Sequence, residues 1–154
     1  SRGGGIVLLK ANEDARVQKV ISLAGVSGYK NRFPKKEKFQ AWVEKGVYFV
    51  KNGRTHQEMP HFYQFFKDFE ENEQRLDIQK ATQNLKIPFL IIHGDNDTSV
   101  AIEEAENLHK WNPKSSFRTI ENANHVFNVS HPWENQKMSQ ELEEVIKHCV
   151  AFLK

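Results

Sequence analysis

The sequence has little cysteine, no long hydrophobic run and almost no net charge, and each shortage excludes a class of protein. Cys149 is the only cysteine, which excludes an internal disulfide framework and a cysteine-only zinc site. The longest apolar runs, such as residues 88–92, are far shorter than the roughly 20 residues that a membrane span needs. The formal net charge is only +2, so no broad basic surface for nucleic acid or anionic lipid is expected. We expect a soluble, cytoplasmic protein with neither a nucleic-acid nor a membrane partner.

Several short motifs are also missing. The sequence contains no H-E-x-x-H, no G-x-x-x-x-G-K-[ST] and no complete G-x-G-x-x-G, so no metal and no cofactor is expected. Residues 1–5 do not resemble the charged start of a secretory signal peptide. A glycine cluster that leads directly into the apolar residues 6–9 is instead typical of the middle of a domain, and we expect upstream residues to be missing from this chain.

What is present alternates between strand and helix patterns. Short apolar runs punctuated by glycine or proline predict buried parallel strands at residues 20–25 and 88–94, and the shorter, alternating run at 116–120 predicts a strand nearer a sheet edge. Helical periodicity covers residues 101–112 and 142–153, and residues 6–10 suit a short buried helix. This order predicts an α/β fold, a three-layer α/β/α sandwich with a mostly parallel sheet.

A mostly helical insertion interrupts the alternation. The pair Asn52-Gly53 between two extended segments predicts a hairpin with a type I′ turn. A helix is predicted next, with Phe62, Phe65, Phe66 and Phe69 along one face. We therefore divide the chain into an initial core segment (1–28), a small lid insertion (29–86) and the rest of the core (87–154).

The first motif with chemical meaning lies at the start of the chain. Ser1-Arg2-Gly3-Gly4 matches the second half of a G-x-S-x-G nucleophile elbow, in which a serine occupies a sharp strand-to-helix turn. The small residue two positions after the serine, Gly3, is expected to let the helix pack close to the strand. By itself the motif is equally compatible with a flexible terminus.

The second and third motifs follow predicted strands. His93-Gly94-Asp95-Asn96-Asp97 places acids at the carboxyl end of a strand, where ligands and catalytic groups gather in α/β sheets. Asp97 is the preferred candidate, while Asp95 and His93 are expected to order the turn. His125, within Asn122–Phe127, is placed in a loop from which a general base can meet that acid, and His131 is its main competitor.

Together the three motifs resemble the α/β-hydrolase fold family, with its chain order of Ser, Asp and His. Within the family, the insertion resembles the lid of dienelactone-hydrolase-like and acylaminoacyl-peptidase-like serine esterases. The resemblance covers essentially the whole chain as a C-terminal portion that starts at the nucleophile. It implies that Ser1 is the nucleophile, His125 the general base, Asp97 the orienting carboxylate and the Arg2 backbone N–H an oxyanion-hole donor.

Three hypotheses remain open. The favoured one is a serine hydrolase that cleaves carboxylic esters or related acyl compounds, with this chain alone incomplete and poorly active. The second is a non-catalytic binding module that keeps the fold. The third is an N-terminal-nucleophile hydrolase in which the amine of Ser1 acts as its own base. Apart from a small acyl substrate, the expected partner is the missing half of the domain or a second copy, through an exposed sheet.

Overall fold

The computed structural model describes residues 1–53, 55–130 and 132–154, and the chain divides into two compact units. The core unit comprises Ser1–Gly28 with Asp77–Lys154, and the insertion unit comprises Tyr29–Leu76. The sequence placed the end of the insertion at residue 86. The boundary lies earlier because the helix at Ile78–Asn84 packs against the first helix of the core unit.

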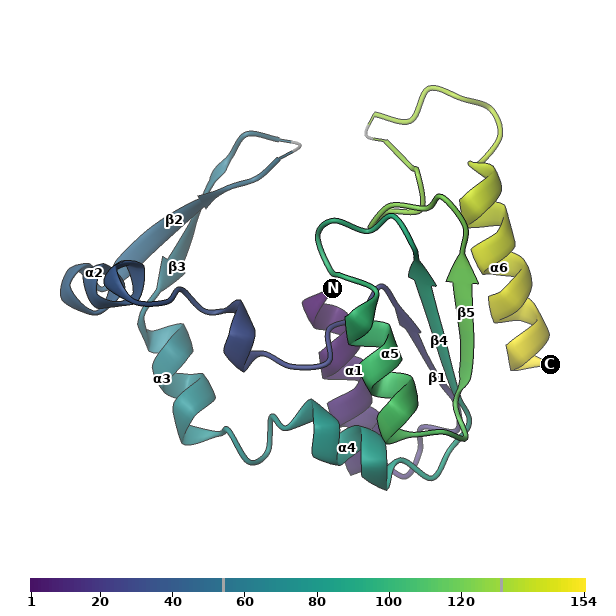
Figure 1. The fold of residues 1–154 in the computed structure, drawn as a ribbon, viewed down its shortest axis with the longest axis horizontal. Coiled ribbons are helices and arrows are strands. Elements are labelled where there is room, and N and C mark those ends of the chain that lie inside the picture. The colour runs from purple at the N-terminus through teal and green to yellow at the C-terminus, as the bar shows by residue number, and fades with distance from the viewer. Residues whose placement is uncertain (54, 131) are drawn as a thin grey trace. The chain divides into compact units, whose positions relative to one another are not determined.

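The core unit is an α/β unit whose described sheet has three parallel strands, in the order β1-β4-β5. Its strands are β1 (Val20–Leu23), β4 (Phe89–Gly94) and β5 (Ser116–Ile120), and its helices are α1 (Arg2–Glu13), α4 (Ile78–Asn84), α5 (Glu103–Trp111) and α6 (Gln140–Leu153). Figure 1 shows α6 on one side of the sheet and α1, α4 and α5 on the other. The α/β class and the mostly parallel sheet predicted from the sequence are confirmed.

The central strand carries the core. Every residue of β4 is buried, as the continuous apolar run predicts for a strand covered on both faces. Leu90 and Ile92 pack in one cluster with Ile120 of β5 and Val145 of α6. Cys149 packs against the same cluster, and burial raises the pKa of its thiol, as befits a structural cysteine. Since all three strands are parallel, their carboxyl ends meet at one edge of the sheet.

Helix α1 approaches the chain after β1 through two glycines. A Cβ added to Gly4 would lie 2.6 Å from the Cα of Gly25, whereas one added to Gly3 would meet nothing within 4 Å. The close approach predicted for Gly3 therefore belongs to Gly4. The helix is also less buried than its composition suggests, because Ile6 is 60% exposed and Val7 is 42% exposed.

The insertion unit is built on a hairpin and aromatic packing. It contains a 3₁₀ turn (Lys30–Arg32), α2 (Glu37–Lys45), β2 (Val47–Lys51), β3 (Glu58–Phe62) and α3 (Gln64–Glu71). The hairpin is confirmed, but its connection runs from residue 52 to 57 and is therefore not a two-residue type I′ turn. Among the described glycines, Gly46 rather than Gly53 has a positive φ.

The four phenylalanines predicted to share one helical face do not all belong to the helix. Phe62 belongs to β3 and is 61% exposed, so it does not extend the helical face. Phe66 and Phe69 of α3 pack with Phe33 and with Trp42, which is 1% exposed. The indole N–H of Trp42 donates to the His61 carbonyl at 2.8 Å, and this bond anchors α2 to the hairpin.

Candidate functional site

Asp97 occupies a buried position in the loop after β4. Its Oδ1 accepts hydrogen bonds from the backbone N–H groups of Ser99 and Val100, each at 2.8 Å, and its side chain is fully buried. Burial raises the pKa of this carboxyl, but the Val100 N–H, the His125 side chain and the Ser99 N–H outweigh burial, so the pKa lies below its usual value. Asp95 was expected to stabilise this turn, but the side chain that bonds to the turn backbone is Asp97.

His125 is held in a loop that asparagine side chains stabilise. Oδ1 of Asn124 accepts from the backbone N–H groups of Val126 and Asn128, each at 3.0 Å. The Asn128 side chain in turn accepts from the Asn124 N–H at 3.1 Å and donates to the Asn122 carbonyl at 3.1 Å. Asn122 and Asn128 have positive φ, a conformation that asparagine tolerates better than most residues. Asn128 is not among the predicted site residues, although an asparagine-rich loop is a signal for such bonding.

Two further contacts tie this loop to the core. Phe127 is buried in the cluster around β4, and its carbonyl accepts from the Ser139 hydroxyl at 2.7 Å. Ser139 is also the N-cap of α6, since its side chain accepts from the Leu142 N–H. The position of His125 is therefore fixed through the start of α6 as well as through its own loop.

The structure brings Asp97 and His125 together. Nδ1 of His125 lies 2.7 Å from Oδ2 of Asp97, and the imidazole is 24% exposed. Because an ionised carboxylate only accepts, Nδ1 is the donor, and this leaves Nε2 of the neutral ring available as a base. The arrangement matches an acid that orients a general-base histidine.

The meeting of the two loops depends on Gly94. A Cβ at this position would overlap the carbonyl oxygen and carbon of Ala123. The same carbonyl accepts from the Asn96 N–H at 3.0 Å, and the Asp95 N–H donates to the Ile120 carbonyl at 3.2 Å. Only glycine lets the loop after β4 approach the loop after β5 this closely.

Ser1 and Arg2 lie at the same edge of the sheet. The amino group of Ser1 donates to the carbonyl of Ala24, just beyond the carboxyl end of β1, at 2.6 Å. Arg2 is the first residue of α1, so its backbone N–H belongs to the positive end of the helix dipole. The competitor His131 lies outside the described residues.

The loop after β1 has a partner that the sequence analysis did not identify. Oε2 of Glu104 accepts from the backbone N–H of Ser27 at 2.7 Å and from its hydroxyl at 2.5 Å. An acid in the first turn of a helix is ordinary in itself, so only the fold could reveal that it bonds to a residue 77 positions away.

The described residues also limit the other kinds of site. They contain no group of three or more His, Cys, Asp and Glu side chains arranged to hold a metal ion. In the same residues, every helix is too short or too polar to cross a membrane.

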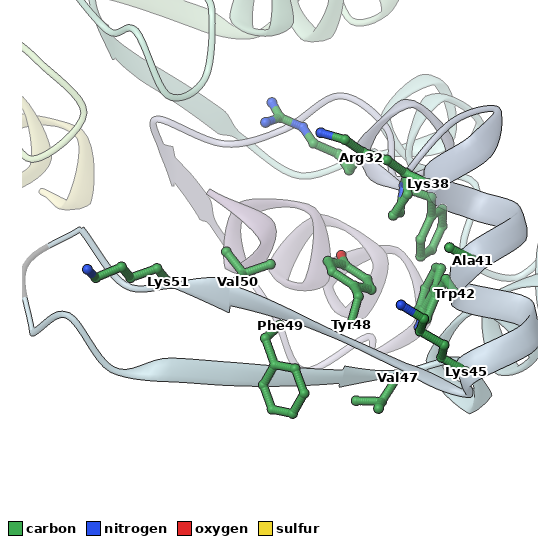
Figure 2. A pocket seen from close by; sticks show the side chains of 12 residues that line it. Arg32, Lys38, Ala41, Trp42, Lys45, Val47, Tyr48, Phe49, Val50 and Lys51 are labelled. Carbon is green, nitrogen blue, oxygen red and sulfur yellow. The ribbon is translucent and has the colours of Figure 1, made fainter.

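The insertion unit contains a separate groove beside β2, with a volume of about 950 Å³. Tyr48 is partly exposed and contributes aromatic surface to it, next to the buried ring of Trp42. Figure 2 shows basic side chains around these rings. Its lining includes Arg32, Lys38, Lys45 and Lys51, and none of the described residues that line it is acidic.

The fold and these strand-end loops define the C-terminal part of an α/β-hydrolase fold. An esterase domain from Rhodothermus marinus superimposes with a TM-score of 0.64 at 19% identity, over 97% of this chain and 56% of its own. Est1E from Butyrivibrio proteoclasticus gives 0.65 at 17% identity, over 99% and 57%. A bromoperoxidase from Bacillus anthracis gives 0.58 at 20% identity, over 99% and 64%.

This chain therefore spans little more than half the length of the first two structures. No protein-family model and no curated protein sequence matches the chain. At such low identities the structures establish the fold. That fold does not suit the N-terminal-nucleophile hypothesis, which calls for a β-sandwich core.

Proposed function

We propose that the protein is a serine hydrolase that cleaves carboxylic esters or related acyl bonds. The observation that carries the proposal is the 2.7 Å hydrogen bond between buried Asp97 and His125 at the carboxyl edge of the sheet. Ser1, at the start of α1, supplies the nucleophile at the same edge. The similar esterase structures support the same class of reaction. The insertion at Tyr29–Leu76 is the basis for a dienelactone-hydrolase-like or acylaminoacyl-peptidase-like subclass.

The proposed reaction proceeds through an acyl-enzyme. Nε2 of His125 takes the proton of the Ser1 hydroxyl as Oγ attacks the carbonyl carbon of the substrate, and Asp97 stabilises the imidazolium. The Arg2 N–H donates to the oxyanion, an interaction whose loss typically costs about 3–4 kcal/mol. His125 then protonates the leaving alcohol, and the same steps with water release the carboxylic acid.

Hydrolysis of a short-chain p-nitrophenyl ester by the natural gene product that contains these residues tests the proposal. We expect turnover that Ser1→Ala and His125→Ala each lower by at least about 10³-fold, because nucleophile and base act as a unit. The matched controls Ser116→Ala and His148→Gln replace residues outside the site and should leave the rate unchanged. Turnover that persists in both site variants would refute the proposal.

The groove of the insertion unit favours a second candidate, a binding module without turnover. A lining that combines apolar surface with four basic residues suits an amphiphilic anion such as a long-chain carboxylate. If the protein binds laurate but shows no Ser1-dependent hydrolysis, this candidate replaces the first. The charge-reversed variant Lys38→Glu should then weaken laurate binding, while Lys35→Glu, outside the groove lining, should not.

A further inference from the structure

His93 is a buried histidine that the proposed reaction does not use. It is the residue before Gly94 in β4, and its side chain is fully buried. Its Nε2 lies 2.8 Å from the carbonyl oxygen of Val100 and 3.3 Å from Oδ2 of Asp97. Its Nδ1 is buried without a hydrogen-bond partner among the described residues.

These contacts determine where the proton of the ring lies. A carbonyl oxygen can only accept, so Nε2 of His93 carries the proton and donates to Val100. A second proton on Nδ1 would leave a buried donor unpaired, which is costly. His93 therefore presents a fixed Nε2–H donor to the Asp97 loop.

The backbone of Val100 bonds to both His93 and Asp97. Its carbonyl accepts from His93, and its N–H donates to Oδ1 of Asp97. His93 belongs to the central strand, in which every residue is buried, so the loop from 97 to 100 is bonded directly to the core of the sheet. The other carboxylate oxygen, Oδ2, lies near two imidazoles, at 2.7 Å from His125 and 3.3 Å from His93.

We propose that His93 is a positioning residue that fixes the Asp97 carboxylate for His125. Its N–H donates to the Val100 carbonyl, and its Nε2, 3.3 Å from Oδ2 of Asp97, limits how that oxygen can move. The catalytic part of this role rests on the proposed function. The geometric part does not, because it concerns only the bond between Asp97 and His125.

The test compares two substitutions of similar bulk, His93→Gln and His93→Leu. Glutamine keeps an N–H donor at a distance from the backbone similar to that of Nε2, and leucine removes the donor. In proton NMR spectra, the Nδ1–H signal of His125 reports directly on its bond to Asp97. We expect this signal in the wild type and in His93→Gln, and its loss or broadening in His93→Leu.

The ester-hydrolysis rate gives a second readout. We expect His93→Leu to lower this rate by about tenfold or more, which is a typical effect of removing a residue that orients a catalytic group from behind. His93→Gln should retain most of the rate. A leucine variant equal to the wild type, or a glutamine variant worse than leucine, would overturn the proposal, since volume alone would then explain the residue.

A measurement on the wild-type protein tests the proposal even if a His93 variant fails to fold. Nitrogen-15 NMR of the wild type should show His93 protonated at Nε2 and not at Nδ1, and the opposite tautomer would overturn the proposal. Repeating the His125 measurement in a Ser1→Ala background separates the two hypotheses. The difference between His93→Gln and His93→Leu should persist there, whether or not Ser1 is a nucleophile.

Discussion

At the scale of single residues, Asp97 has the most closely defined surroundings in the site. Both carboxylate oxygens are in use, with Oδ1 accepting two backbone N–H groups and Oδ2 accepting Nδ1 of His125. An amide cannot reproduce this, because one of its two polar atoms donates. The environment thus requires an ionised acid at this position.

Asp97→Asn should therefore keep the size of the side chain and lose its function. We expect the ester-hydrolysis rate to fall by about 10⁴-fold, since the imidazole would lose the acceptor that sets its tautomer. The control is Asp95→Asn, an exposed residue of the same turn, which should retain the rate. A fall of less than tenfold in Asp97→Asn would contradict the assigned role.

The lowered pKa of Asp97 predicts how stability depends on pH. A folded-state pKa below the ordinary value of 3.8 means that the ionised form stabilises the fold. That contribution is complete above the unfolded pKa of about 3.9 and is lost as the pH falls through the folded value. The wild type should exceed Asp97→Asn in urea midpoint at pH 7, and the difference should shrink steadily below pH 4. If the difference in urea midpoint instead grew as the pH fell, the pKa of Asp97 could not be lowered in the folded protein.

At the scale of elements, close backbone approach at two glycines organises the site. Gly94 lets the loops after β4 and β5 meet, and Gly4 lets α1 meet the chain after β1. Gly94→Ala should push the Ala123 carbonyl away and separate Asp97 from His125, so we expect loss of the downfield His125 signal and of hydrolysis. Gly53→Ala, where an added Cβ meets nothing within 4 Å, is the matched control.

The pair Gly4→Ala and Gly3→Ala tests the packing of α1 in the same way. Gly4→Ala should destabilise the core unit, because its new methyl group would lie 2.6 Å from the Cα of Gly25. Gly3→Ala should be neutral or stabilising by up to about 1 kcal/mol, the difference in helix propensity. Thermal unfolding of both variants measures this. Equal unfolding temperatures for Gly4→Ala and Gly3→Ala would show that α1 moves away from Gly25 without loss of stability.

Elements defined by local pattern could be predicted, and contacts between distant loops could not. The run 88–94 and the alternation at 116–120 indicate their strands because burial and period are local properties. The turn after Asn52 and the place of Phe62 depend on pairing within the hairpin, which overrides the short-range signal. The bonds of His93 and Asn128 appear only when loops far apart in sequence meet.

At the scale of the whole molecule, the described sheet ends at β1. This strand pairs only with β4 among the described residues, and Leu23 on it is 41% exposed. An unprotected strand edge with apolar side chains favours pairing with another chain. We propose that this edge pairs with a second copy of the chain.

Light scattering on the 154-residue chain tests this proposal. We expect a mass above that of the monomer at micromolar concentration, and Leu23→Lys should reduce it because a charge at the edge opposes pairing. The control is Lys114→Ala, an exposed position away from β1, which should leave the mass unchanged. Lys19 lies closer to β1 but is unsuitable, because its side-chain amine bonds to the Phe152 carbonyl. A concentration-independent monomer would contradict the proposal.

Active-site labelling identifies the nucleophile without relying on any one substrate. The natural gene product should be treated with a fluorophosphonate and the adduct located by peptide mass spectrometry. We expect one adduct on Ser1, formed rapidly in the wild type and lost in His125→Ala and Asp97→Asn. Labelling of another residue, or no labelling of a folded protein, would contradict the proposed mechanism.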